Sequence, residues 1–98
     1  MFLNKLYTVI NKSDLEVTIL LSDANHPIFK AHFPSQPILP GFIHLEIISK
    51  LFDIAIIGVK KAKFNEIVLP NDILKYIKND TKIKVTCNDK IVANFNLG

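Results

Sequence analysis

The apolar and polar residues follow two different periods along the chain, which predict strands near both ends and one helix between them. Residues 15–21 alternate between apolar and polar side chains, the period of a half-buried strand. The turn-forming residues 11–14 connect them to a short strand at residues 5–10, which together indicate a hairpin. After Gly58 the pattern of strands returns, and it predicts strands at residues 59–69, 73–77, 82–87 and 91–95. Asn88-Asp89 is expected to form a tight hairpin turn between the last two.

The middle of the chain predicts a long loop followed by a buried helix. Four of the five prolines lie in residues 22–41, and proline restricts both its own backbone and that of the preceding residue, so this segment is expected to be extended and irregular. Residues 42–57 are apolar around most of a helical circumference, which indicates a helix covered on several sides. The order of elements predicts one α+β domain over residues 1–98, with an antiparallel sheet wrapped around one long central helix.

Composition narrows the classes of function. The chain has 12 Lys and no Arg, with a formal net charge of +3, so the bidentate contacts that read guanine or phosphate are missing and a nucleic-acid partner is not expected. The single cysteine, Cys87, excludes an internal disulfide and a Cys-rich zinc site. No apolar run reaches the ~18 residues of a membrane span. The first residues lack the layout of a signal peptide, so a cytoplasmic location without membrane attachment is expected.

The stretch from His32 to Glu46 holds the candidate chemistry. It places an imidazole in a proline-rich loop and a carboxyl on the helix that follows, with Pro40-Gly41 at the start of the helix and no side chain there suited to cap it. Uncapped N–H groups at a helix start can stabilise a carbonyl oxygen that gains negative charge. An imidazole near neutral pH suits a general base, and a glutamate in an apolar pocket suits a general acid. These three groups are what an elimination next to a carbonyl requires.

This stretch resembles the active-site signature of the (R)-3-hydroxyacyl-ACP dehydratases, the FabZ/FabA-type thioester dehydrases. The residues that match the spacing of the family are His32, Phe33, Pro34, Pro37, Pro40, Gly41 and Glu46. The resemblance implies a hot-dog fold of about six strands around one helix. It also implies a homodimer, or a higher oligomer built from it, whose sites combine His32 of one subunit with Glu46 of the other. It also implies that the Gly41 N–H holds the thioester carbonyl, with Phe33 and Pro40 beside the substrate.

By the same resemblance, the substrate is a 3-hydroxyacyl thioester that is dehydrated to the trans-2-enoyl thioester in fatty-acid or polyene/polyketide-like biosynthesis. The acyl chain would arrive on the phosphopantetheine of an acidic acyl carrier protein, or on coenzyme A, and no other cofactor is expected. The candidates to meet the carrier are Lys30, Lys60, Lys61 and Lys63. We expect no metal, because His26, His32 and His44 match no known spacing of metal ligands.

Alternatives stay open at this point. The same fold could serve an acyl-thioesterase, which needs an activated water instead of an elimination, or a non-catalytic module that binds acyl thioesters. Lys50 stands where the family has Gln, and Glu46 with Lys50 has the spacing of an ordinary exposed ion pair on a helix. Ser35 replaces a family glycine, and His44 replaces an aliphatic residue; neither His44 nor His26 is expected to be catalytic.

Overall fold

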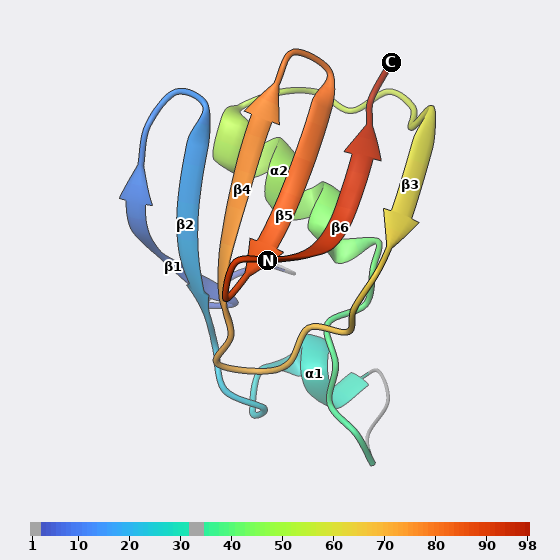
Figure 1. The fold of residues 1–98 in the computed structure, drawn as a ribbon. Helices are drawn as coiled ribbons and strands as arrows, with labels where there is room; N and C mark the ends of the chain where they lie inside the picture. The colour runs from blue at the N-terminus through green and yellow to red at the C-terminus, as the bar shows by residue number, and fades with distance from the viewer. Residues whose placement is uncertain (1–2, 32–34) are drawn as a thin grey trace.

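The computed structural model describes residues 3–31 and 35–98, which form an antiparallel sheet and two helices (Figure 1). The sheet in these residues has six strands in the order β1-β2-β4-β5-β6-β3, and each neighbouring pair is antiparallel. The predicted α+β class and the expected number of strands are confirmed. The elements are β1 (Tyr7–Lys12), β2 (Glu16–Leu21), α1 (Pro27–Ala31), α2 (Ile43–Phe52), β3 (Lys61–Phe64), β4 (Ile73–Asn79), β5 (Lys82–Cys87) and β6 (Lys90–Asn96).

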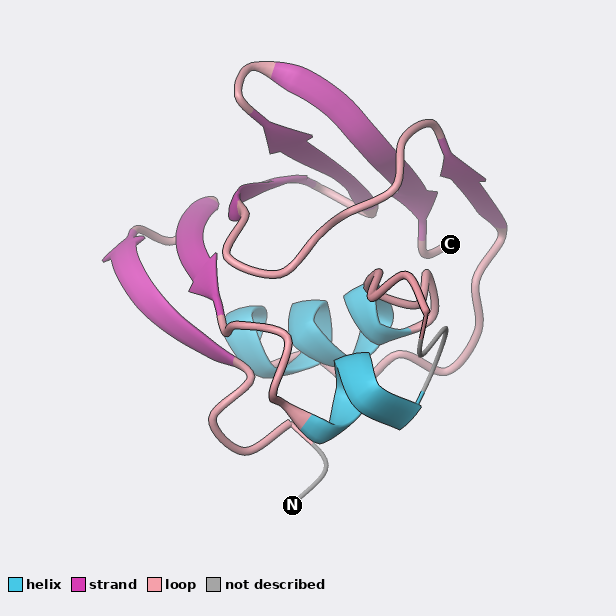
Figure 2. Ribbon diagram, turned by 90° about the horizontal axis from the view of Figure 1, so that it is seen from below, coloured by secondary structure: helices cyan, strands magenta, loops and turns pink. Residues whose placement is uncertain are grey.

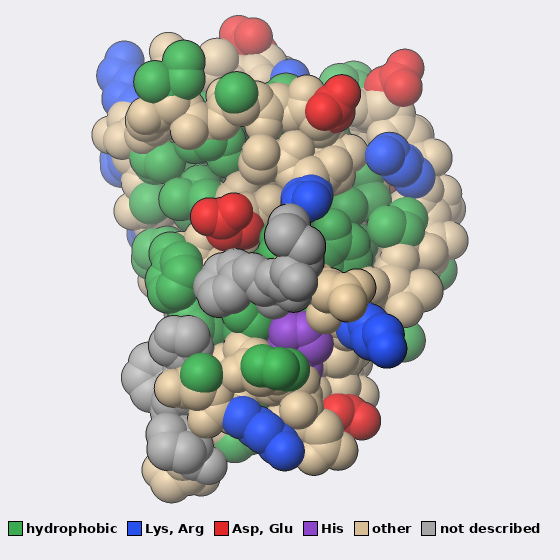
Figure 3. Space-filling view, turned by 180° about the vertical axis from the view of Figure 1, so that it is seen from behind, with side chains coloured by type: hydrophobic (Ala, Val, Ile, Leu, Met, Phe, Trp, Pro, Cys, Tyr) green, Lys and Arg blue, Asp and Glu red, His purple; other side chains and the backbone are tan. Residues whose placement is uncertain are grey.

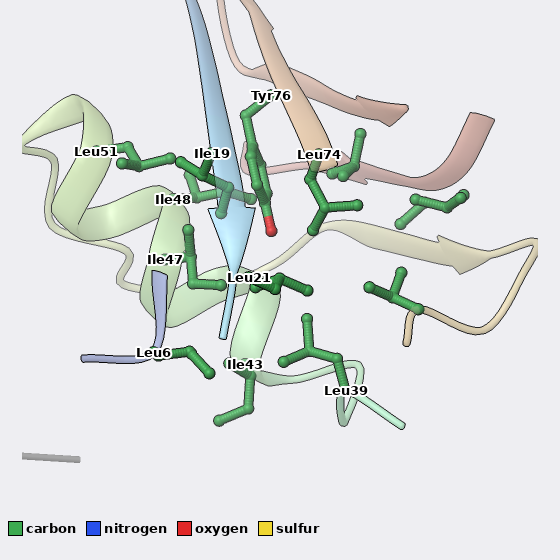
Figure 4. Packing of buried hydrophobic residues seen from close by; sticks show 14 of the residues in the cluster. Leu6, Ile19, Leu21, Leu39, Ile43, Ile47, Ile48, Leu51, Leu74 and Tyr76 are labelled. Atoms are coloured by element: carbon green, nitrogen blue, oxygen red, sulfur yellow. The ribbon is translucent and has the colours of Figure 1, made fainter. Parts of the chain in front are cut away.

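The sheet curves around α2, and its strands β2, β4 and β5 turn their alternating buried residues toward the helix (Figure 2). In α2 the buried apolar residues recur at the spacing of one helix face: Ile43, Ile47, Ile48 and Leu51. They point toward Ile19 and Leu21 of β2 and toward Leu74 and Tyr76 of β4 (Figure 4). Full burial of each such side chain contributes about 1.5–3 kcal/mol, so this layer holds the helix against the sheet.

Helix α2 ends earlier than the apolar pattern predicts. The expected helix over residues 42–57 stops at Phe52, because Asp53 adopts a left-handed conformation with φ 52° and ψ 51°. The Ile54 N–H then donates to the Ser49 carbonyl at 3.1 Å, and the Ser49 hydroxyl donates to the Ile54 carbonyl at 2.6 Å. These two bonds satisfy groups that a helix end leaves open. The apolar residues that follow form a connection to β3 rather than further helical turns.

The sequence predicts an irregular segment over residues 22–41, but the structure contains the short helix α1 within it. Pro27 occupies the first position of this short helix, where its missing N–H costs nothing. The residue before it, His26, caps the helix with its ring, because the Ile28 N–H donates to His26 Nδ1 at 3.0 Å. His26 Nε2 lies 2.7 Å from the Asn4 carbonyl and therefore carries the ring proton that it donates there.

The expected long strand over residues 59–69 is reduced to the four residues of β3. Beyond Phe64 the ladder with β6 stops, because the N–H groups of Asn65 and Glu66 both donate to one carbonyl, that of Val92, at 2.8 and 3.3 Å. The chain then turns toward the loop that precedes α2, where the Leu39 N–H donates to the Val68 carbonyl at 2.8 Å. This bond ties the chain after β3 to the loop that leads into α2.

The two hairpins at the C-terminal end form as the sequence predicts. Asn88 and Asp89 both have positive φ, 52° and 64°, between the paired residues Cys87 and Lys90. This is the backbone of the two-residue turn that suits the twist of antiparallel strands. Neither helix within residues 3–31 and 35–98 has the length or the apolar surface that a bilayer crossing requires.

Candidate active site

The start of α2 offers one backbone donor at Gly41. The sequence predicts an uncapped start, and Phe42, at the N-cap position, indeed makes no side-chain capping bond. The N–H groups of the next three residues are not free, however, because Ile43, His44 and Leu45 donate to the carbonyls of residues 40–42 at 3.0, 3.1 and 3.1 Å. Within the described residues the Gly41 N–H makes no hydrogen bond. Gly41 is therefore the donor available to a carbonyl oxygen.

Close packing explains why a glycine stands at this position. A Cβ atom built on Gly41 would lie 2.7 Å from Cε1 and 2.9 Å from Cζ of Phe64 in β3. Any side chain there would push the Phe64 ring away, and that ring also packs edge-on against Phe95 with centroids 5.6 Å apart. Pro40, just before Gly41, is buried. The loop before α2 is thus held against β3 and places the Gly41 backbone at the edge of the sheet.

Glu46 lies in the first turn of α2 with its side chain exposed. One turn before it, Phe42 is 52% exposed, although it is large and apolar. The alternative ion pair with Lys50 does not form: the salt bridge found among residues 3–31 and 35–98 joins Lys90 and Glu66 at 3.6 Å. Residues 3–31 and 35–98 of one chain therefore leave the Glu46 carboxyl exposed rather than enclosed in an apolar pocket. Hydrophobic side chains do line the back of the molecule on the side of β3 (Figure 3).

His32 and Phe33, the predicted base and its neighbour, lie outside the described residues, as does Pro34 of the motif. The chain reaches them directly from the last residue of α1. The hydrogen bonds of His26 anchor the first residue of α1 to the segment before β1. His26 therefore acts as a structural residue that fixes the start of the short helix preceding His32 in sequence.

His44 faces the opposite side of α2 from Glu46. Its ring is 3% exposed, and Nδ1 shares a hydrogen bond of 2.7 Å with the Tyr76 hydroxyl inside the core. Burial lowers the pKa of His44 to about 4, and burial together with the nearby Tyr7 raises the pKa of Tyr76 well above its ordinary value. The sequence analysis did not predict this hydrogen-bonded pair. The one feature of the sequence that indicated it is His44 itself, a polar residue among the apolar residues of the predicted helix.

Two of the four lysines predicted to meet a carrier line a common groove, and the other two do not. Lys61 and Lys63 lie on the outward side of β3, in a groove whose other cationic lining residues are Lys82 and Lys84 of β5. Lys30 lies at the end of α1, and Lys60 precedes β3; neither lines that groove. In the described part of the chain, no three His, Cys, Asp or Glu side chains come together in a way that could hold a metal ion.

Comparison with known proteins gives concordant matches. The model of the ApeI-like family, described as ApeI dehydratase, matches residues 9–94. The 3-hydroxyacyl-[acyl-carrier-protein] dehydratase FabZ of Clostridium botulinum is 35% identical over 74 residues, covering 62% of this chain and 51% of the relative. The corresponding protein of Clostridium acetobutylicum is 34% identical over 73 residues, covering 61% and 52%. The chain thus spans about half the length of these curated relatives.

A solved structure, the dehydratase heterocomplex ApeI:P from Xenorhabdus doucetiae, has a similar fold. The TM-score is 0.69 with 19% sequence identity, and the match covers 91% of this chain and 93% of the other. An uncharacterized protein from Erwinia carotovora matches with a TM-score of 0.53 at 18% identity. The likeness extends over almost the whole chain, so the curved sheet and its helix are shared.

Proposed function

Because the chain belongs to the ApeI-like dehydratase family, we propose that it removes water from a 3-hydroxyacyl thioester and produces the trans-2-enoyl thioester. The observation that carries this proposal is the free Gly41 N–H, held by the contact with Phe64 at the start of the helix that bears Glu46. Only a donor that makes no bond within the protein can be given to the oxygen of a substrate. The hot-dog assignment is supported by the likeness to the dehydratase heterocomplex.

In this proposal each group takes one part of the elimination. The Gly41 N–H binds the thioester oxygen and stabilises the negative charge that develops when His32 takes the proton from carbon 2. The electron pair of that bond forms the new double bond between carbons 2 and 3. The bond from carbon 3 to oxygen breaks, and the hydroxyl leaves as water with a proton from Glu46. No electron is gained or lost, so the reaction needs no redox cofactor.

The protonated Glu46 needs apolar surroundings, and a second subunit is the proposed source of them. In one chain, Phe42 and Phe64 are 52% and 53% exposed, and β3 forms the edge of the sheet. A partner that covers this side would remove the apolar surface from water and would bring its own His32 loop toward Glu46. We propose a homodimer with shared sites. The heterocomplex ApeI:P shows that a related assembly contains two different chains.

The proposed substrate is a 3-hydroxyacyl chain carried on the phosphopantetheine of an acyl carrier protein. The name of the FabZ relatives includes this carrier as the bearer of their substrate. The pathway would be the synthesis of fatty acids or of polyene-like chains. Coenzyme A thioesters share the pantetheine arm and are the natural comparison substrate.

Subunit mixing tests both the chemistry and the shared site. Glu46→Gln and His32→Ala should each lower the turnover of a 3-hydroxyacyl carrier protein by ~10²–10⁴, the usual contribution of a positioned acid or base. If the two residues act across subunits, mixing the two inactive variants should restore activity, because mixed dimers contain one intact site. Mass spectrometry of the thioester for loss of one water measures this, with each variant alone as the control.

Other outcomes distinguish the competing functions. Release of the free hydroxy acid with a free thiol would identify a thioesterase. Binding of the carrier without any change in mass would identify a non-catalytic module. Recovery of activity would not occur on mixing if both residues came from the same subunit, and this outcome would refute the shared site while leaving the dehydratase proposal in place.

A further inference from the structure

A shallow groove with a volume of about 580 Å³ lies on the outer face of the sheet, over β3, β6, β5 and the end of β4. These four strands are neighbours in the sheet, and α2 packs behind them (Figure 1). We define the lysine groove by six of its lining residues, Lys61, Lys63, Lys82, Lys84, Asn94 and Asn96, and Ile77 and Asn79 of β4 complete its outward-facing lining. We propose that the lysine groove is the docking surface for an acidic carrier protein that delivers the acyl chain.

The register of the strands fixes the positions of the lysines. Lys61 and Lys82 both pair with Asn96, from opposite sides, and Lys63 and Lys84 pair in the same way with Asn94. Neighbouring strands lie about 4.8 Å apart, and alternate residues lie about 6.7 Å apart along a strand. The Cα atoms of the four lysines therefore form a rectangle of roughly 10 by 7 Å, with the two asparagines along its midline.

The charges in the lysine groove are unbalanced. None of its lining residues is acidic, so the four ammonium groups repel one another. The asparagines add directional donors. Asn96 Oδ1 already accepts bonds from the Thr81 hydroxyl at 3.3 Å and from the Gly98 N–H at 3.2 Å, which occupies the acceptor of this side chain and leaves its amide N–H groups for another molecule. A cluster of carboxylates matches both features.

The chemistry of the lysine groove favours an acidic protein over a nucleic acid. The chain contains no Arg, so planar bidentate contacts with phosphate or guanine are not available. The aromatic lining residue, Phe95, is buried on the core side and offers no stacking surface. A compact rectangle of four point charges suits a small set of carboxylates and speeds their encounter through steering.

The position of the lysine groove suits delivery to the proposed site, and the inference rests on the proposed function in this respect. Lys63 precedes Phe64, which contacts Gly41 on the inner side of the same strand. A carrier bound outside β3 would thus be one strand away from the candidate oxygen donor. The sequence singled out Lys61 and Lys63, and the structure adds Lys82 and Lys84 to them in place of Lys30 and Lys60.

The test compares two variants with equal changes of charge. Lys82→Glu with Lys84→Glu reverses the side of the lysine groove farther from the edge strand, whereas Lys5→Glu with Lys12→Glu changes exposed lysines outside it, before β1 and at its end. The first measurement is binding of fluorescent holo carrier protein by anisotropy. We expect the groove variant to bind about ten-fold more weakly and the control variant to bind as the wild type does. Wild-type binding should weaken as salt rises.

The second measurement is the ratio of kcat/KM for the carrier-linked substrate to that for the same acyl group on free pantetheine. This ratio should fall about ten-fold in the groove variant and stay constant in the control. Equal losses in both variants, no loss in either, or preferential binding of an RNA or DNA oligonucleotide would overturn the proposal. If neither substrate turns over but carrier binding still depends on Lys82 and Lys84, the proposed function fails and the docking surface stands.

Discussion

The hydrogen bond between His44 and Tyr76 places one polar pair inside an otherwise apolar core. The Tyr76 hydroxyl and His44 Nδ1 lie 2.7 Å apart, and the His44 ring also lies 5.9 Å from the ring of Phe95. Buried polar groups are costly unless each has a partner, so the two residues depend on each other. Because burial holds the pKa of His44 at about 4, the imidazole is neutral in the folded protein near pH 7.

This pair predicts that stability decreases below neutral pH. The unfolded chain binds a proton at His44 near pH 6.5, whereas the folded chain binds it only near pH 4. The contribution of this group is therefore complete above pH 6.5 and is lost as the pH falls from 6.5 to about 4, by roughly 3 kcal/mol. Urea unfolding at about pH 7 and about pH 4 measures it.

The matched control is the double variant His44→Leu with Tyr76→Phe, which removes the titrating group and leaves no unpaired hydroxyl. It should lose less free energy of unfolding than the wild type over the same pH range. All carboxyl groups and His26 are common to both proteins, so the difference reports on His44. Equal losses in the two proteins would show that folding does not change the pKa of His44.

At the scale of single elements, the end of α2 depends on one residue in an unusual conformation. Asp53 has φ 52°, a region that favours glycine, and its negative charge lies at the negative end of the helix dipole. Asp53→Gly should raise the free energy of unfolding by about 0.5–1 kcal/mol, since it removes both unfavourable terms. Thermal unfolding followed by circular dichroism measures the change.

Asp53→Ala serves as the comparison because alanine favours a continued helix. It keeps a Cβ atom in the left-handed conformation, so it should gain less than the glycine variant. A more stable alanine variant with greater helix content would mean that the helix continues toward Ile57, as the apolar pattern alone suggests.

The elements that the sequence predicted well have periodic patterns, and those it predicted poorly depend on single backbone bonds. The alternation in β2 and β5 identified both strands, and Asn88-Asp89 identified the tight turn between β5 and β6. Nothing in the apolar run after Phe52 revealed that Ser49 would close the helix with two bonds to Ile54. Helix α1 had one readable signal, Pro27 in the first position, but its cap is a histidine ring, which is not a usual capping group.

The candidate site could be predicted in part, for a similar reason. The motif identified Gly41 and Glu46 by spacing, and the helix start does lack a side-chain cap. Spacing could not show that three of the first N–H groups would be used in tight turns, nor that Phe64, eighteen residues after Glu46, would require a glycine at position 41. It also could not show the exposure of Glu46 in one chain, which follows from its position on the outer face of α2.

At the scale of the whole molecule, the exposed apolar surface beside β3 predicts self-association. Phe64→Asp places a charge where the proposed partner would bury an aromatic ring, so it should convert the proposed dimer to monomers and abolish the proposed dehydration together. Sedimentation and turnover measure the two effects. Leu15→Asp is the control, because Leu15 is also large, apolar and exposed but lies before β2, near the opposite edge of the sheet. A Phe64→Asp protein that stays dimeric and active would contradict the proposed interface.

The order of strands has a consequence for biosynthesis. Strand β2 finds its second neighbour in β4, and β3 finds its neighbour only in β6, the last strand of the chain. During synthesis on the ribosome, the apolar face of α2 emerges before the four strands that follow it in the chain, β3 to β6, have been translated. The apolar side of α2 is fully covered only after the last strand has been made, and such transiently exposed apolar surface favours aggregation during synthesis.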